Sequence, residues 1–115
     1  MNYIDFEVGN KTYKLRLNTK NIILMERTLG RNPVMIFGLD PENPSIPSIT
    51  EMVAILHAAL QQYNHGISMN DAYDIFDEYM EEHAATDFIS VIMSLFQQCG
   101  IMPTNEEVSE EEKNA

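Results

Sequence analysis

The feature that most constrains this chain is a strict alternation of apolar and charged residues on either side of Gly9-Asn10. The apolar members of the two segments are Ile4, Phe6, Val8, Tyr13, Leu15 and Leu17. A period of two is typical of half-buried strands, and a two-residue Gly-Asn loop favours a primed turn that sets the register. Counting outward from the turn pairs Phe6 with Tyr13 and Ile4 with Leu15. The sequence therefore predicts a hairpin, whose apolar face needs a cover because an isolated hairpin is marginally stable in water.

Capping signals predict four helices after the hairpin. The expected caps are Asn18 or Thr19, Ser48, Ser68 and Thr86, and the expected stops are Gly30, Asn64-His65-Gly66 and Gly100. Glu51 lies three residues after Ser48, which predicts a capping box at the second helix. Between the first two helices, an apolar patch at residues 34–37 is followed by a loop that contains three prolines.

Length and composition fit one domain. The chain has 115 residues, 44% of them hydrophobic, which is enough for a core without disulfides or a metal. We predict an α+β fold, with an N-terminal β-hairpin packed on a mostly helical bundle of about four helices. Residues 1–100 are expected to form this single domain, with the last helix, Asp87 to Cys99, at its centre. Residues 101–115, which contain the acidic run Glu106 to Glu112, are expected to be a disordered acidic tail.

Charge is unevenly distributed along the chain. Seven Lys and Arg residues against 18 Asp and Glu give a formal net charge of −11, and six of the seven basic residues lie within the first 31 positions. Because such a body repels phosphate backbones, we expect no nucleic-acid partner. The single Cys99, the absence of a signal-peptide pattern at the N-terminus and the absence of an apolar run of roughly 20 residues predict a soluble, cytoplasmic protein without a membrane partner.

The sequence contains no motif for catalysis, cofactor binding or metal binding. It lacks the GK[ST] core of a phosphate loop and the GxSxG pattern of a serine nucleophile. His57, His65 and His83 lie in separate segments without the spacing of a zinc site. The acidic residues between 71 and 82 predict a solvated helix face, because one helix cannot wrap oxygen ligands around a cation. We therefore expect that this chain is not an enzyme.

The last helix carries more apolar surface than one core contact requires. At roughly 100° per residue its apolar side chains cover an arc of about 200°, about twice the usual stripe. The chain also has eight methionines, whose flexible side chains suit surfaces that accept varied apolar partners. This surplus predicts a partner-binding surface, and together with the exposed hairpin edge it favours a homo-oligomer. The residues predicted to bind the partner are Ile89, Met93, Phe96, Ile55 and Met52.

The order of these elements resembles a known family. The segments FEVGNKTYKLRL, MERTLGRNP, SITEMVAILHAAL and SMNDAYDIFDEYM are similar to those of the small tail assembly chaperones of long-tailed bacteriophages and prophages of Gram-positive hosts. The likeness covers about residues 3–100. It implies a small acidic protein that coats the apolar helices of the phage tape measure protein, without ATP, until the tail tube assembles around it. The tail tube protein is a further partner implied for longer family members, and we do not assign it because no folded extension is expected after Gly100.

Two other classes of function remain open. An acidic DNA mimic that inhibits a DNA-binding protein would explain the charge, and it predicts acids spaced like phosphates over a whole surface. A small enzyme would need acids or histidines that converge around a pocket. The wide apolar arc favours the chaperone over both.

Overall fold

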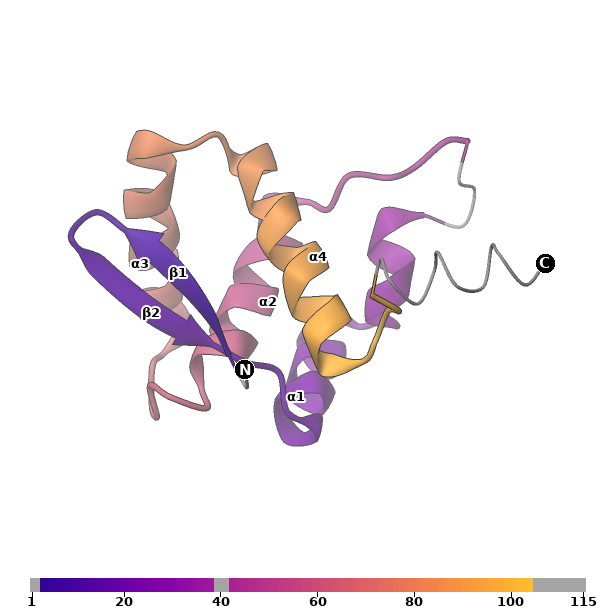
Figure 1. Cartoon of the computed structure of the whole chain (residues 1–115), viewed down its shortest axis with the longest axis horizontal. Helices are drawn as coiled ribbons and strands as arrows, with labels where there is room; N and C mark the ends of the chain where they lie inside the picture. The colour runs from indigo at the N-terminus through magenta and orange to yellow at the C-terminus, as the bar shows by residue number, and fades with distance from the viewer. Residues whose placement is uncertain (1–2, 39–41, 105–115) are drawn as a thin grey trace.

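The computed structural model describes residues 3–38 and 42–104 (Figure 1). In chain order its elements are β1 (Ile4–Val8), β2 (Lys11–Leu15), α1 (Thr19–Leu29), the 3-10 helix η1 (Pro33–Phe37), α2 (Ile49–Leu60), α3 (Met69–Glu82), the 3-10 turn η2 (Ala85–Asp87) and α4 (Phe88–Cys99). The predicted fold class is confirmed, since the described residues form an N-terminal antiparallel hairpin on four α-helices. The predicted acidic tail lies, from residue 105 onward, outside the described residues.

The hairpin has the predicted register. Ile4 pairs with Leu15 and Phe6 with Tyr13 across the two strands. Its apolar face is covered, because the Phe6 ring lies edge-on to that of Phe88 of α4, with 5.5 Å between ring centroids. Gly9 in the turn adopts a φ of 58°, which L-residues with a Cβ rarely adopt. The hairpin thus closes one side of the helical core.

The predicted caps are present at the first three helices. The Asn18 side chain accepts a hydrogen bond from the backbone N–H of Asn21 at 2.8 Å, and Ser48 and Ser68 form capping boxes. The prediction that Thr86 caps the last helix is wrong. The Asp87 carboxylate instead accepts from the N–H of Ala84 at 3.1 Å, so the chain makes the turn η2 before α4 begins at Phe88.

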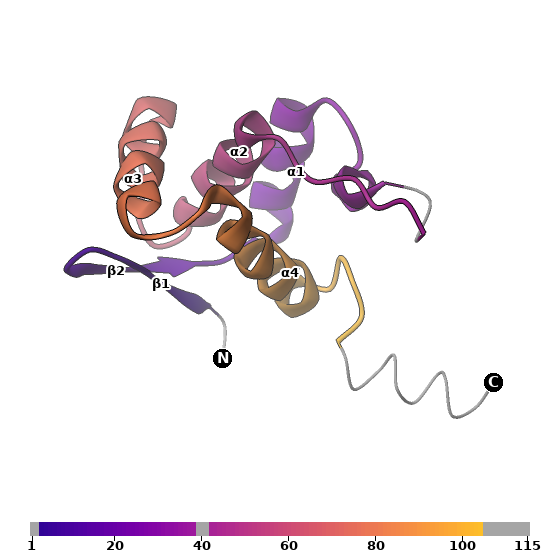
Figure 2. The same cartoon turned by 90° about the horizontal axis from the view of Figure 1, so that it is seen from above.

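The helix at the centre of the domain is α2. It packs against α1, α3, α4 and β2, and Figure 2 shows it between α1 and α3. The prediction of a central last helix is therefore wrong, because α4 buries one side alone. The small side chains Ala54, Ala58 and Ala59 allow neighbouring elements to approach α2 closely, and these three alanines are at most 3% exposed.

The folded part of the chain extends past residue 100. Ile101 and Met102 are half-buried and pack against the core. The N–H of Met102 donates to the carbonyl oxygen of Phe96 at 3.0 Å, which turns the chain back over the end of α4. The predicted domain boundary at residue 100 is therefore too early.

Candidate functional site

Three of the five residues predicted to bind a partner belong to the core. Met52 is 2% exposed, and Ile55 and Phe96 are fully buried, so the prediction is wrong for them. Met52 and Ile55 lie on the central helix, which has no free side there. The Phe96 ring is covered by that of Phe37 in η1, with 6.3 Å between the centroids. The sequence pattern indicates no helix or strand for that segment and so does not predict this cover.

The other two predicted residues, Ile89 and Met93, are half-buried on α4. Ile89 packs against the core along one edge of its side chain. The two residues therefore offer a narrow apolar strip rather than the broad surface that the arc of the last helix predicted.

A more exposed apolar surface lies where the end of α1 meets the beginnings of α2 and α3. This hollow of about 270 Å³, here called the apolar groove, is lined by Thr28, Leu29, Ile49, Thr50, Glu51, Val53, Ala54, Met69 and Tyr73. Ile49 is 52% exposed and Tyr73 is 51% exposed, so two large apolar side chains in one hollow remain half in solvent. Both recur at helical spacing with apolar neighbours, a pattern that by itself favours the packed faces of their helices. Ile49 is the first residue of α2, directly after the Ser48 cap, and this position is the signal that could have placed it at the surface.

The rim of the apolar groove is held by an ion pair. Arg31 Nε donates to Glu51 Oε2 at 3.0 Å, and the Ser48 N–H donates to Glu51 Oε1 at 3.1 Å. Burial opposes the ionisation of Glu51, but the Ser48 backbone N–H and the Arg31 guanidinium outweigh it and lower the pKa of the carboxyl. These contacts fix the first turn of α2 and with it the position of Ile49.

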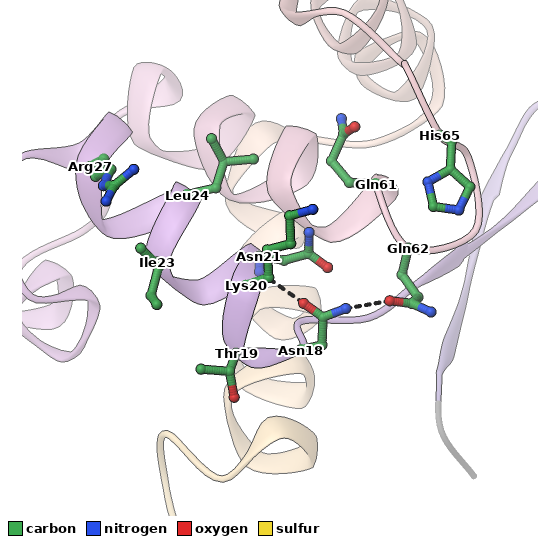
Figure 3. A pocket seen from close by; sticks show the side chains of 10 residues that line it. All are labelled: Asn18, Thr19, Lys20, Asn21, Ile23, Leu24, Arg27, Gln61, Gln62 and His65. Atoms are coloured by element: carbon green, nitrogen blue, oxygen red, sulfur yellow. Dashed lines mark hydrogen bonds between the residues drawn. The ribbon is translucent and has the colours of Figure 1, made fainter.

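A second hollow lies along α1, from its N-terminal cap to Arg27 in its last turn, and beside the end of α2 (Figure 3). It has a volume of about 740 Å³ and is lined by Asn18, Thr19, Lys20, Asn21, Ile23, Leu24, Arg27, Gln61, Gln62 and His65. We call it the basic hollow, because Lys20 and Arg27 line it and none of the described Asp or Glu residues does. Within the described part of the chain neither cation forms an ion pair.

Four carboxamide side chains give the basic hollow its polar lining. Asn18 connects the two helices, since its side chain caps α1 and also donates through Nδ2 to Gln62 Oε1. Asn21 is 6% exposed, and its Oδ1 has no hydrogen-bond partner among the described residues. A buried amide oxygen without a partner is uncommon in folded proteins. The basic hollow therefore contains an acceptor that no described residue of the chain satisfies.

The two hollows lie along one side of the α1–α2 pair. On α1, Leu24 lines the basic hollow and Thr28, one turn later, lines the apolar groove. On α2, Ala54 lines the apolar groove and Gln61, two turns later, lines the basic hollow. Residues four or seven apart share a helix face, so the two hollows follow the same stripe on both helices.

A family profile matches residues 4–112 of the chain. The chain belongs to DUF6096, a family of unknown function. No curated protein and no solved structure matches it. The matched range includes the hairpin, all four helices and both hollows, so the candidate site lies within the part of the chain that defines its membership of DUF6096.

Other chemistry-bearing side chains of this DUF6096 domain serve the fold or face solvent. His57 hydrogen-bonds through Nε2 to the carbonyl oxygen of Ile67 at 3.1 Å and so holds the loop after α2. Burial raises the pKa of the Cys99 thiol. In residues 3–38 and 42–104, no three His, Cys, Asp or Glu side chains are placed to hold a metal ion. Over the same ranges no helix is both long and apolar enough to cross a membrane.

Proposed function

We propose that this DUF6096 chain is a tail assembly chaperone of a long-tailed phage or prophage. In this role it binds apolar helical stretches of the tape measure protein in the host cytoplasm, without ATP, until the tail tube assembles. The observation that carries the proposal is the apolar groove, in which Ile49 and Tyr73 stay half-exposed beside Leu29 and Met69. The resemblance of the sequence to known tail assembly chaperones supports the same role.

The groove suits a helical ligand. An amphipathic helix buries its apolar face in a groove through residues at i, i+3, i+4 and i+7. Thr50 and Gln61 are separated by 11 steps along α2 and its C-cap, or about 16 Å at 1.5 Å per residue, which corresponds to about three turns of a bound helix. One such contact is smaller than the roughly 1,000 Å² of a stable interface, so protection of a long partner requires several copies of the chain.

Charge supports the same role. The outer face of α3 carries exposed acids, among them Asp74, Asp77, Glu81 and Glu82. With a formal net charge of −11, a coat of such chains keeps an apolar partner soluble and keeps loaded complexes apart. The apolar groove lies between helices α1, α2 and α3, and its single acid, Glu51, is paired with Arg31.

The test is co-expression with a tape measure fragment that is insoluble alone. Ile49→Asp places a charge in the apolar groove, and Ile46→Asp is the matched control, because Ile46 is 67% exposed and does not line the groove. Met93→Asp tests the α4 edge that the sequence predicted. We expect the fragment to stay soluble when it is co-expressed with the wild type or with Ile46→Asp. With Ile49→Asp we expect it to be insoluble. Equal solubility with all the variants, or with no chaperone, contradicts the proposal.

The acidic face of α3 also favours a second candidate, a DNA mimic. Five exposed acids, Asp71, Asp74, Asp77, Glu81 and Glu82, lie within the 14 residues of this helix, or about 21 Å of its length. A mimic would bind a basic DNA-binding protein with strong salt dependence. In a mimic, Asp74→Asn and Asp77→Asn would abolish that binding and Ile49→Asp would leave it unchanged. A chaperone should show the reverse pattern.

A further inference from the structure

We propose that the acidic segment 106–112 of the chain docks on its own basic hollow, along the exposed side of α1. The contact goes beyond the proposed function, because it lies within one chain and needs no partner. It pairs the two cations of the hollow, Lys20 and Arg27, with glutamates of the segment, and it covers Ile23 between them. An acidic ligand from outside therefore has to displace the segment to reach these cations.

The basic hollow presents two cations on either side of an apolar side chain. Lys20 and Arg27 are seven residues apart on α1, which separates them by about 10 Å along the helix axis at 1.5 Å per residue. Ile23 lies between them and is 45% exposed, and all three side chains line the hollow (Figure 3). Within the described part of the chain neither cation has an acidic partner. This surface fits a ligand that carries acids on both sides of an apolar residue.

The segment after residue 104 has that composition. Residues 105–115 contain five Glu and one Lys, which gives them a formal net charge of −4. Val108 lies among the glutamates, with Glu107 before it and Glu110 after it. An extended chain rises about 3.3 Å per residue, so the three steps from Glu107 to Glu110 span about 10 Å. This length equals the separation of the two cations along α1.

The end of α4 lies next to the basic hollow. Gln98 and Cys99 line a small hollow of about 290 Å³ together with Asn18 and Thr19. Asn18 and Thr19 also line the basic hollow, so the two hollows adjoin at the start of α1. Arg16 lines the small hollow and adds a third cation on the path from α4 to α1.

The segment is long enough to cover the hollow. The N–H of Met102 donates to the carbonyl oxygen of Phe96, which keeps the described end of the chain beside the last turn of α4. From there the 11 residues 105–115 reach about 36 Å when extended at 3.3 Å per residue. Thr19 and Arg27 are eight steps apart on α1, or about 12 Å. Two thirds of the reach therefore remains to bridge from α4 to α1.

Tethering favours the segment of the same chain over that of another copy. A short tether gives an effective concentration in the millimolar range. Two separate copies each carry a formal net charge of −11 and repel each other. Because Lys20 and Arg27 are exposed, each ion pair is weak and is screened by salt. The docked state should therefore be populated at low ionic strength and lost at high ionic strength.

The experiment places a nitroxide on the segment and follows the amide signals of the full chain by NMR. The nitroxide is attached at position 114 in Cys99→Ala/Asn114→Cys, which has a single thiol. A nitroxide broadens the signals of nearby amides, so we expect a loss of intensity at Lys20, Ile23 and Arg27 in about 0.1 M salt. The intensity should recover in about 1 M salt, where the Debye length is about 3 Å.

Matched variants assign the contact to the basic hollow. Lys20→Gln/Arg27→Gln removes both cations and should restore the signal of Ile23. Lys11→Gln/Lys14→Gln removes the same charge from the hairpin and should leave the broadening unchanged. Melting curves of each variant check that the fold is intact.

A second measurement needs no change at Cys99. In the otherwise native chain, Glu107→Gln/Glu110→Gln should shift the amide signals of α1. Asp74→Asn/Asp77→Asn removes the same charge from α3 and should leave those signals in place.

Three results overturn the inference. If α1 shows neither broadening nor shifts, the segment does not dock there. If the hairpin variant removes the broadening as completely as Lys20→Gln/Arg27→Gln, the segment is attracted to any cation and the hollow is not its site. If nitroxide-labelled chains broaden α1 of isotope-labelled chains that carry no nitroxide, the segment docks on another copy. None of these results bears on the solubility of the tape measure fragment, so the two proposals fail separately.

Discussion

Comparing Ile55→Ala with Ile49→Ala tests which residues of α2 belong to the core and which lie at the surface. Ile55 is fully buried, whereas Ile49, on the same helix, is 52% exposed. Truncation of a fully buried isoleucine removes its transfer free energy and leaves a cavity, which together cost about 2–5 kcal/mol. For a domain of 60–100 residues each kcal/mol shifts the melting temperature by roughly 4–8 °C, so Ile55→Ala should lower it by at least about 8 °C. Ile49→Ala should cost less than about 1 kcal/mol, because half of its side chain is already in water.

The assay is thermal and urea unfolding followed by circular dichroism, with both variants measured beside the wild type. The affinity for an amphipathic helical peptide is then measured for the same two proteins. Ile55→Ala should be less stable than the wild type but should keep its peptide affinity under conditions in which it is folded. Ile49→Ala should keep its stability and bind the peptide more weakly. A melting temperature of Ile55→Ala within about 2 °C of the wild type would refute the assignment of Ile55 to the core and would restore it as a candidate for partner binding.

Three further predictions follow from local geometry. Gly30 has a φ of 72° at the end of α1, so Gly30→Ala should lower the unfolding free energy by about 1 kcal/mol in urea titration, although no neighbour obstructs a Cβ. Ser48→Ala removes a cap and should cost about 1 kcal/mol at neutral pH. Because the pKa of Glu51 lies below its ordinary value of 4.5 in the fold, this carboxyl stabilises the chain above that pH and its contribution is lost as pH falls; Ser48→Ala keeps the backbone N–H and Arg31, so the unfolding free energy of both proteins should fall in acid. Burial raises the pKa of Cys99, so iodoacetamide should alkylate the native thiol several-fold more slowly than the urea-unfolded one at pH 8, and equal rates would contradict its burial.

Much of the local structure follows from the sequence because it depends on neighbours along the chain. The register from Ile4 to Leu15 follows from a two-residue turn and a period of two, and the caps at Asn18, Ser48 and Ser68 follow from side chains that reach the first turn of their own helix. The predicted Thr86 cap is absent for a local reason as well. Asp87 lies in the same turn, and its carboxylate accepts a hydrogen bond from the N–H of Ala84.

The identity of the central helix did not follow from hydrophobic pattern. The wide apolar arc of α4 predicted a central helix, but the central helix is α2, which packs against α1, α3, α4 and β2 and whose small alanines are buried. Periodicity measures how much apolar surface a helix has and carries no information on which neighbour covers it. Phe96 illustrates this, since its cover is Phe37, 59 residues earlier in the chain.

The candidate site depends on tertiary structure for the same reason. The sequence determined the hairpin, the helix starts, the segregation of charge and a surplus of apolar side chains, each of which is a property of nearby residues. Packing decided which of those side chains remain in water: Ile49 and Tyr73, 24 residues apart in the chain, meet in one groove, while Met52 and Ile55 are enclosed. Exposure is what remains of a side chain's surface after every neighbour is placed, so the docking of α1 and α3 on α2 had to be known before the site could be located.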